Sequence, residues 1–107
     1  MAEQVQRIRT IDRVERGASE EAIQAHYDVG NDFYSLWLDE SMTYSCAIWE
    51  GDDDTLEDAQ NRKIDYHIQQ ASAQDAETVL EIGCGWGSCL RRLVSQFRVK
   101  QAIGLTL

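Results

Sequence analysis

The chain has no proline among its 107 residues, and its three cysteines form no CxxC pair. An odd cysteine count without paired spacing argues against a disulfide framework and a cysteine-rich zinc site, and it favours a reducing, cytoplasmic compartment. Long hydrophobic runs are also missing, so no stretch could span a bilayer. The first residues lack the apolar segment of a signal peptide.

Basic residues are scarce: ten Lys and Arg stand against nineteen Asp and Glu, which gives a formal net charge of −9. Nucleic-acid binding needs a basic face, so this balance argues against a nucleic-acid partner. Residues 1–17 differ, because four arginines there outnumber three carboxylates. This arm could make a peripheral membrane contact or touch an acidic partner; the alternative is a solvated helix face.

The first half of the chain has the pattern of a helical region. Apolar spacing and capping residues predict helices over residues 3–16, 19–27 and 31–38. Residues 42–49 are expected to form an extended segment or loop.

A longer helix should begin at Thr55, which with Asp58 resembles a capping box. Its expected inward residues are Leu56, Ala59, Ile64, Ile68 and Ala71, with Arg62, Lys63 and Asp65 on the flanks. His67 on this helix has no partner visible in the sequence, so packing or hydrogen bonding is favoured over catalysis. The acidic turn at residues 52–54 is interpreted as helix N-terminal charge, because no second acidic cluster stands at metal-ligand spacing.

The most informative stretch runs from Thr78 to Leu93. Residues 78–82 have the β-branched and aliphatic composition of a buried strand, and residues 83–87 read Gly-Cys-Gly-Trp-Gly. The helical pattern that follows has Leu90, Leu93, Val94 and Phe97 on one face, and a second strand begins over 101–107. This order predicts a β-α-β unit whose glycine turn presents backbone N–H groups at a helix N-terminus.

The glycine spacing narrows the choice of ligand. Dinucleotide-binding turns read GxGxxG and P-loops end in GK[ST], whereas Gly83, Gly85 and Gly87 form GxGxG. Gly83 can take positive φ, Gly85 lets a ligand approach the backbone, and Gly87 lets the following helix pack closely. Glu81 can accept hydrogen bonds from an ammonium group or from the turn itself. The pattern suits S-adenosylmethionine, which has an ammonium group and no phosphate; the alternative is a tight turn without a ligand.

Val79–Gly87 resembles the first motif of class I S-adenosylmethionine-dependent methyltransferases. The Gly-Cys-Gly-Trp-Gly wording resembles one branch, the cyclopropane fatty acid synthase and mycolic acid cyclopropane synthase family. Residues 26–34 resemble that family's N-terminal signature, and residues 42–49 resemble its Tyr-Ser-Cys segment. With further matches in residues 55–60 and 104–107, the resemblance covers nearly the whole chain.

The fold that this resemblance implies is α/β. An N-terminal helical cap over residues 1–76 would precede the first β-α-β unit of a Rossmann-like methyltransferase sheet, which begins at 77–107. The absence of proline and the apolar C-terminus suggest a chain cut within that domain, and the family's remaining bicarbonate ligands and substrate channel would lie beyond position 107. Such a fragment is expected to be inactive alone.

The resemblance also implies roles for individual residues. The cofactor-binding residues would be Tyr44, Ser45, Leu80, Glu81, Ile82, Gly83, Cys84, Gly85, Trp86, Gly87, Thr106 and Leu107. Cys46 would line the site where the family holds a bicarbonate ion as general base; apart from the family, a small buried hydrophobe is an equal alternative. Tyr27 and Phe33 would order the cap over the site.

The implied reaction moves a methyl group from S-adenosylmethionine to a cis alkene in a lipid acyl chain, after which loss of a proton closes a cyclopropane ring. One alternative is a methyltransferase with a small-molecule or polyketide acceptor. Another is a non-catalytic cofactor-binding or interaction module. The oligomeric state does not follow from the sequence.

Overall fold

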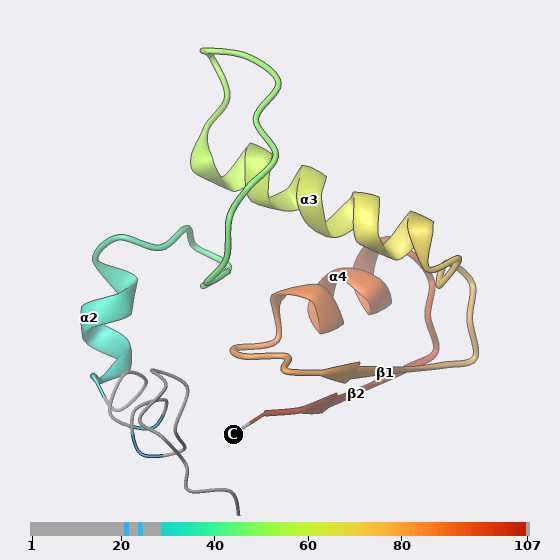
Figure 1. Cartoon of the computed structure of the whole chain (residues 1–107). Coiled ribbons are helices and arrows are strands. Elements are labelled where there is room, and N and C mark those ends of the chain that lie inside the picture. Colours follow the sequence, from blue (N-terminus) through green and yellow to red (C-terminus); the bar gives the residue numbers. More distant parts are fainter. Residues whose placement is uncertain (1–20, 22–23, 25–28, 107) are drawn as a thin grey trace, which may run out of the picture. The chain divides into compact units, whose positions relative to one another are not determined.

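The computed structural model describes residues 21, 24 and 29–106 (Figure 1). The chain divides into two compact units, residues 1–31 and 32–107. The helices predicted over 3–16 and 19–27 lie largely outside the described residues, although Glu21 and Gln24 are helical. The functional division predicted between residues 76 and 77 stays a prediction.

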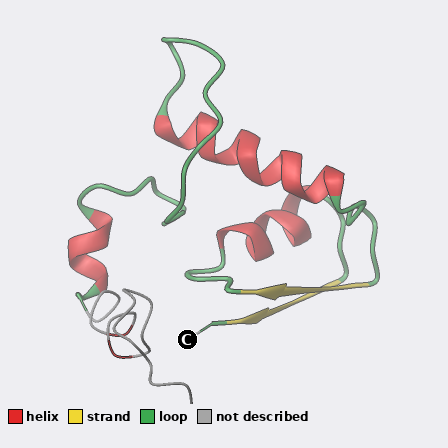
Figure 2. Cartoon of the chain, in the orientation of Figure 1, coloured by secondary structure: helices red, strands yellow, loops and turns green. Residues whose placement is uncertain are grey.

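Within the described residues, the predicted β-α-β unit is present. The elements in chain order are α2 (Asn31–Ser35), α3 (Leu56–Gln70), β1 (Thr78–Ile82), α4 (Ser88–Gln96) and β2 (Gln101–Leu105). The two strands pair in parallel, with Thr78 opposite Gln101 and Ile82 opposite Leu105. Helix α4 forms the connection between them (Figure 2). The sequence placed β1 and the end of α4 correctly, and β2 ends at Leu105.

The core lies between α3, α4 and one face of the sheet. Its buried members are Ile64, Ile68, Leu93 and Val99, none more than 4% exposed. Val79 and Ala102, which face each other across the strands, pack against this cluster. Full burial of one such aliphatic side chain stabilises the fold by roughly 1.5–3 kcal/mol, so these few contacts fix how the helices sit on the sheet.

The opposite face of the sheet is apolar and exposed. Its residues are Leu80, Ile82, Ile103 and Leu105, with exposed fractions of 56%, 80%, 42% and 53%. The prediction of a buried strand is therefore wrong for Leu80 and Ile82, and Val79 is partly buried. Side chains of a strand alternate between faces, and the helices cover only one of them. An uncovered apolar face is what a two-stranded parallel sheet implies.

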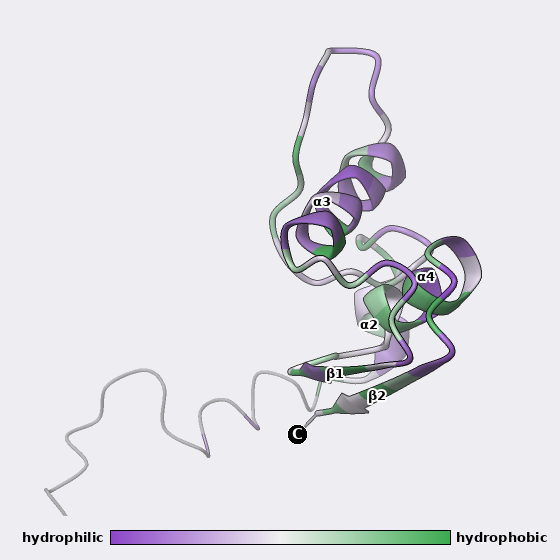
Figure 3. Ribbon diagram, turned by 90° about the vertical axis from the view of Figure 1, so that its right-hand side faces the viewer, coloured by the Kyte–Doolittle hydropathy of each residue, from purple (hydrophilic) through white to green (hydrophobic). Residues whose placement is uncertain are grey.

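Helix α3 starts with the predicted capping box. The Asp58 backbone N–H donates to Thr55 Oγ1 and the Thr55 N–H donates to Asp58 Oδ2, both over 3.1 Å. The helix surface is mostly hydrophilic, with its hydrophobic positions in the minority (Figure 3). The predicted inward residues that are buried are Ala59, Ile64 and Ile68.

Three expectations for α3 were wrong. Leu56, in the first turn, is 36% exposed, and Ala71, the residue that caps the C-terminus, is exposed. Both lie at the ends of α3. Lys63, expected on a flank, is buried with 8% exposure, because the segment that precedes α3 in sequence packs over it.

Two other helices depart from their predicted patterns. Helix α2 ends at Ser35 rather than at Leu38, and residues 36–38 continue in turns whose N–H groups donate to Phe33 and Tyr34 carbonyls. In α4 the residues that face the core are Cys89, Leu93 and Phe97. That i, i+4, i+8 row moves Val94 to the side, where it is 51% exposed.

Candidate cofactor site

The glycine turn joins the C-terminal end of β1 to the N-terminus of α4. Gly83, Gly85 and Gly87 have φ values of 79°, 52° and 81°, a region that glycine alone enters without steric cost. The N–H groups of Gly83 and Cys84 donate to the Leu105 carbonyl over 2.7 and 3.1 Å. The end of β2 therefore holds the start of the turn.

One side of this turn is open. A Cβ placed on Gly83 or Gly85 would meet no heavy atom within 4 Å, so a ligand has room to reach the backbone there. A Cβ on Gly87 would make only ordinary contacts, at 3.7 Å to Arg91 and 3.8 Å to Leu90. Close helix packing is therefore not what requires glycine at position 87; its left-handed φ is.

The close contact is at Gly104 instead, which the sequence suggested only as part of a motif block. A Cβ there would lie 2.5 Å from Leu90 Cδ1 and 2.6 Å from Cys84 Sγ. The absence of a side chain on β2 thus lets the glycine turn and the start of α4 rest directly on the strand.

Glu81 lies at the end of β1, opposite Gly104, on the face that the helices cover. Its Oε2 is buried and has no hydrogen-bond partner among the described residues. Burial raises the pKa of Glu81, and a hydrogen bond from the Cys89 thiol opposes this shift. Burial, together with the Glu81 charge, raises the pKa of Cys89 to about 11. An unpaired buried carboxylate oxygen has the capacity to accept a hydrogen bond from a cationic ligand.

An aromatic cluster connects α2, Tyr44 and the glycine turn. Tyr34 is 2% exposed, and its ring centroid lies 5.1 Å from Trp86, 5.3 Å from Tyr44 and 5.7 Å from Trp37. Trp37 also meets Tyr44 edge-on at 5.4 Å. Each such pair contributes about 0.5–1.5 kcal/mol beyond burial. Tyr44, predicted to close over the cofactor, is thereby tied to the turn through Tyr34.

Sequence reasoning missed Tyr34. The residues of this aromatic-rich part of the chain that were predicted to order the cap are Phe33, which is 49% exposed, and Tyr27, which lies outside the described residues. The available signal was the i, i+3 spacing of Tyr34 and Trp37, which places both rings on one side of a helical turn.

Asp39 organises the turn that leads to Tyr44. The residue is 8% exposed, and its carboxylate accepts hydrogen bonds from the Ser41 N–H over 3.1 Å and the Thr43 N–H over 2.9 Å. A short polar side chain that bonds to the following backbone is a common way to fix such a turn.

Arg91 joins this turn to the glycine turn. Its guanidinium donates to the Ser41 carbonyl over 2.9 Å and to the Trp86 carbonyl over 2.7 Å. Residues far apart in sequence are thus held by one side chain of α4, a role that nothing in the local sequence indicates.

Helix α3 also holds residues 43–45 by hydrogen bonds. Gln60 Nε2 donates to the Ser45 carbonyl over 2.7 Å and to the Thr43 carbonyl over 3.3 Å. The Lys63 ammonium donates to Ser45 Oγ. Cys46 comes next and is exposed, so the alternative of a small buried hydrophobe at this position is wrong.

The predicted cofactor residues divide between two faces of the sheet. Glu81 points to the inner face, whereas Leu80 and Ile82 point to the exposed outer face, away from it. Thr106 follows the β2 residue whose carbonyl holds the turn, and Leu107 lies outside the described residues. The structure joins Tyr44 and Trp86 through the ring of Tyr34, and it places Ser45 against Gln60 and Lys63 of α3. Glu81 and the three glycines follow one another at the end of β1.

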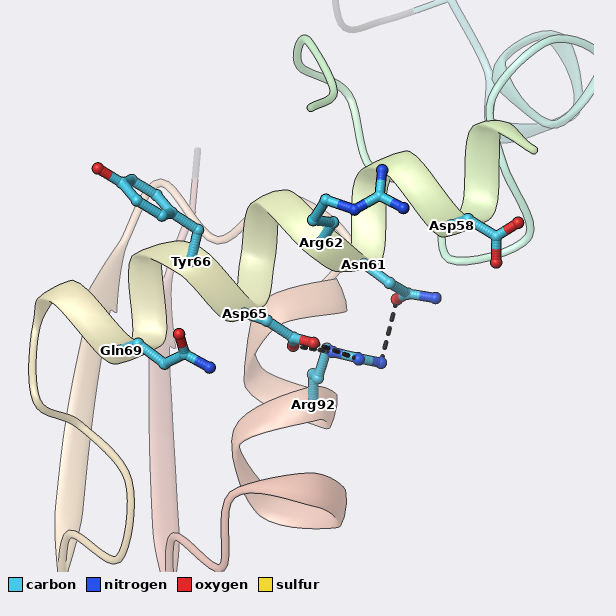
Figure 4. A pocket seen from close by; sticks show the side chains of 7 residues that line it. All are labelled: Asp58, Asn61, Arg62, Asp65, Tyr66, Gln69 and Arg92. Carbon is cyan, nitrogen blue, oxygen red and sulfur yellow. Dashed lines mark hydrogen bonds and ion pairs between the residues drawn. The ribbon is translucent and has the colours of Figure 1, made fainter. Parts of the chain in front are cut away.

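A pocket of about 540 Å³ lies along α3 and α4, on the side shown in Figure 4. Its lining residues are Asp58, Asn61, Arg62, Asp65, Tyr66, Gln69 and Arg92. Arg92 forms a two-pronged ion pair with Asp65, and Arg62 forms one with Asp54. No predicted site residue lines this pocket, so it is separate from the glycine turn. Both of its guanidinium groups already bond to carboxylates.

Other predicted features have structural roles. Asp54 accepts from the Glu50 and Gly51 N–H groups over 2.7 and 3.3 Å, and this closes the acidic turn. His67 is exposed and lies edge-on to Tyr66 at 5.6 Å. Over residues 21, 24 and 29–106, no three His, Cys, Asp or Glu side chains could share a metal ion, and no helix could cross a membrane.

A parallel strand pair joined by a helix, with a positive-φ glycine turn and a carboxylate near the end of its first strand, is the first β-α-β unit of a Rossmann-like fold. The comparison with known families is more specific. The family described as mycolic acid cyclopropane synthetase matches residues 14–107, and the chain belongs to this family.

Cyclopropane mycolic acid synthases are similar to this chain in sequence. Cyclopropane mycolic acid synthase MmaA2 of Mycobacterium tuberculosis (strain H37Rv) is 49% identical over 87 residues, which cover 81% of this chain and 30% of the relative. Cyclopropane mycolic acid synthase 3 of the same strain is 47% identical over 85 residues, covering 79% and 29%. The chain thus spans about 30% of the length of these relatives.

Solved structures agree. The structure of MmaA2 from Mycobacterium tuberculosis matches with a TM-score of 0.74 at 49% identity, over 80% of this chain and 30% of that one. Mycolic acid cyclopropane synthase CmaA1, solved with SAH and CTAB, matches with a TM-score of 0.70 at 45% identity, over 78% and 29%. Coclaurine N-methyltransferase, bound to N-methylheliamine and SAH, has a TM-score of 0.75 over 83% and 26% of the two chains, and at 22% identity it shows the fold alone.

Proposed function

We propose that this chain supplies the cofactor turn and the covering segment of an S-adenosylmethionine-dependent cyclopropane synthase that acts on lipid acyl chains. The observation that carries the proposal is the buried Oε2 of Glu81, which has no partner in the described part of the chain and precedes a glycine turn that is open at Gly83 and Gly85. Membership of a family whose members include cyclopropane mycolic acid synthases supports the choice of reaction.

The chain's own residues fit this cofactor. Glu81 would accept a hydrogen bond from the ammonium group, and Gly85 would let the ligand lie against the backbone. Tyr44 and Ser45 would cover it: Tyr34 packs against both Tyr44 and Trp86 of the turn, and Gln60 of α3 holds the Ser45 carbonyl. When bound, S-adenosylmethionine supplies the electrophilic methyl group.

The acceptor in this proposal is a cis alkene within an acyl chain. Phe33, Leu36 and Trp37 are 49%, 81% and 46% exposed and adjoin the aromatic cluster, which gives apolar surface for such a chain. Exposed Cys46 would offer its thiol as a hydrogen-bond donor to a bicarbonate base. A lipid acceptor also fits a cytoplasmic protein in peripheral contact with a membrane.

Calorimetric titration with S-adenosylhomocysteine tests the cofactor assignment. The chain is expected to bind, and Glu81→Gln should weaken binding about tenfold or more, because a hydrogen bond to a charged group is worth roughly 1.5–3 kcal/mol. Glu77→Gln is the matched control, since Glu77 lies just before β1 and its exposed side chain pairs with Lys100 in solvent. Absence of binding by the unmodified chain, or equal affinity in Glu81→Gln, contradicts the assignment.

The acceptor is tested with the protein as its natural source makes it. Incubation with methyl-labelled S-adenosylmethionine should label vesicles whose lipids carry cis-unsaturated chains and leave vesicles of saturated lipids unlabelled. Label that appears only in a soluble small molecule would instead identify a small-molecule methyltransferase and reject the lipid acceptor.

A further inference from the structure

Lys63 is a buried cation with an unusual setting. Its side chain leaves the middle of α3, is 8% exposed, and makes no ion pair within 4.0 Å among the described residues. Burial lowers the pKa of Lys63, and the groups that oppose this shift from neighbouring segments are Cys46, Asp39 and Cys89. Burying an ammonium group is costly unless it is well bonded, so the contact it makes is informative.

That contact is Ser45 Oγ, to which the Lys63 ammonium donates. Gln60, three residues earlier on the same face of α3, donates to the Ser45 and Thr43 carbonyls. The side chain and the carbonyl of one residue are therefore both held from α3. Ser45 is nevertheless exposed, so a molecule in solvent can reach it while α3 holds it in place.

The direction of this hydrogen bond has a chemical consequence. A hydroxyl group has one proton to donate and two lone pairs that accept. Since the Lys63 ammonium can only donate, it occupies a lone pair of Ser45 Oγ and leaves the hydroxyl proton directed elsewhere. Ser45 is thereby prepared to donate to an acceptor atom of a bound molecule, and the adjacent positive charge strengthens that donor.

We propose that Lys63 is a positioning residue for the cofactor site: its ammonium orients the Ser45 hydroxyl as an outward donor and, with Gln60, holds residues 43–45 in place beside the glycine turn. This inference rests on the proposed function for the identity of the ligand. The placement of residues 43–45 by α3 is independent of it, because the contacts are made within the chain.

The test combines three variants with two measurements. Lys63→Met keeps the side-chain length and removes the donor, Ser45→Ala removes the acceptor at an exposed position, and the double variant joins them. Hydrogen exchange is followed at the amides of Thr43 and Ile48, which flank Ser45 and are bonded to Asp39 and to the Ala59 carbonyl. Affinity for S-adenosylhomocysteine is measured by calorimetry. Lys100→Met, at an exposed lysine, is the control.

The expected result separates positioning from simple stabilisation. Lys63→Met should speed exchange at Thr43 and Ile48 about fivefold and weaken binding about tenfold, while the melting temperature holds or rises because a buried charge is gone. Strand amides of β1 should exchange as before. The double variant should be no worse than Ser45→Ala, because both changes delete the same contact.

Other outcomes would overturn the proposal. Unchanged exchange and affinity in Lys63→Met would show that the contact positions nothing, and additive losses in the double variant would show that Lys63 acts apart from Ser45. If Lys63→Met does not fold, Ser45→Ala carries the same exchange test alone. If the unmodified chain does not bind S-adenosylhomocysteine, the proposed function fails, and the exchange data still decide whether Lys63 holds the segment.

Discussion

At the scale of single residues, Glu81 lowers the stability of the ligand-free fold and provides an acceptor for the proposed cofactor. Its carboxylate is partly desolvated and one oxygen is unpaired among the described residues. Such a group lowers the stability of the ligand-free fold, because the charged form is better solvated in the unfolded chain. The proposed cofactor would bond to the same oxygen. The buried carboxylate therefore both destabilises the ligand-free fold and provides the binding contact.

This predicts a pH dependence for Glu81. Because its pKa is raised on folding, the folded chain holds the proton more tightly than the unfolded chain does. The resulting stability is fully present below the ordinary carboxyl pKa of 4.5 and is lost as the pH rises through the raised value. Urea unfolding from pH 4 to pH 7 should show this loss, and Glu81→Gln should reduce it and stabilise the chain at pH 7. An identical pH profile in Glu81→Gln and the unmodified chain would contradict the prediction.

Gly104 is the residue at which added volume should be least tolerated. In Gly104→Ala the new methyl group would meet Leu90 at 2.5 Å and Cys84 at 2.6 Å, so the turn or α4 must shift. Overpacking of this kind costs about 1–3 kcal/mol, measured as a lower midpoint of urea unfolding. Gly51→Ala is the control, because a Cβ there would meet nothing within 4 Å; equal effects of the two changes would refute the packing role.

At the scale of whole elements, α3 depends on its N-terminus. Thr55 and Asp58 satisfy each other's backbone N–H groups there, and loss of such a cap typically costs about 1 kcal/mol. Thr55→Ala should therefore lower the unfolding free energy by about that amount. Ser95→Ala, at an exposed position of α4, should have no destabilising effect. A thermal or urea series that ranks the two variants alike would speak against the cap.

The elements that the sequence predicted are those with local causes. The capping box, the aliphatic β1 strand and the glycine turn each depend on residues within a few positions of one another, so their pattern is readable from the chain. The positive φ predicted for Gly83 is also confirmed.

The features that the sequence did not predict depend on contacts between distant segments. Lys63 was expected on a helix flank because Lys is usually solvated, but residues 43–45 fold over it. The burial of Tyr34 follows from the aromatic cluster with Tyr44 and Trp86. Gly104 has a packing role only once the turn lies on β2. In each case the partner is far along the chain, and local propensity carries no information about it.

At the scale of the whole molecule, the apolar outer face of the sheet favours self-association and the net charge opposes it. Leu80, Ile82, Ile103 and Leu105 form an exposed apolar surface, and such surfaces promote association. The net charge of −9 opposes it by repulsion between copies. Salt screens this repulsion, since the Debye length shortens from about 10 Å at 0.1 M to about 3 Å at 1 M, while burial of apolar area persists.

Self-association of the chain should therefore rise with salt and depend on this face. Sedimentation velocity at 0.1 M and 1 M sodium chloride is expected to show larger species at the higher concentration, because screening weakens the repulsion. Ile82→Gln should reduce them, since Ile82, at 80%, is the most exposed of these four side chains. Val94→Gln, which removes a 51% exposed aliphatic side chain from α4, leaves the sheet unchanged and should behave as the unmodified chain does. If Ile82→Gln associates as strongly as Val94→Gln, the contact surface lies elsewhere, because both variants carry the same net charge and lose a similar aliphatic side chain.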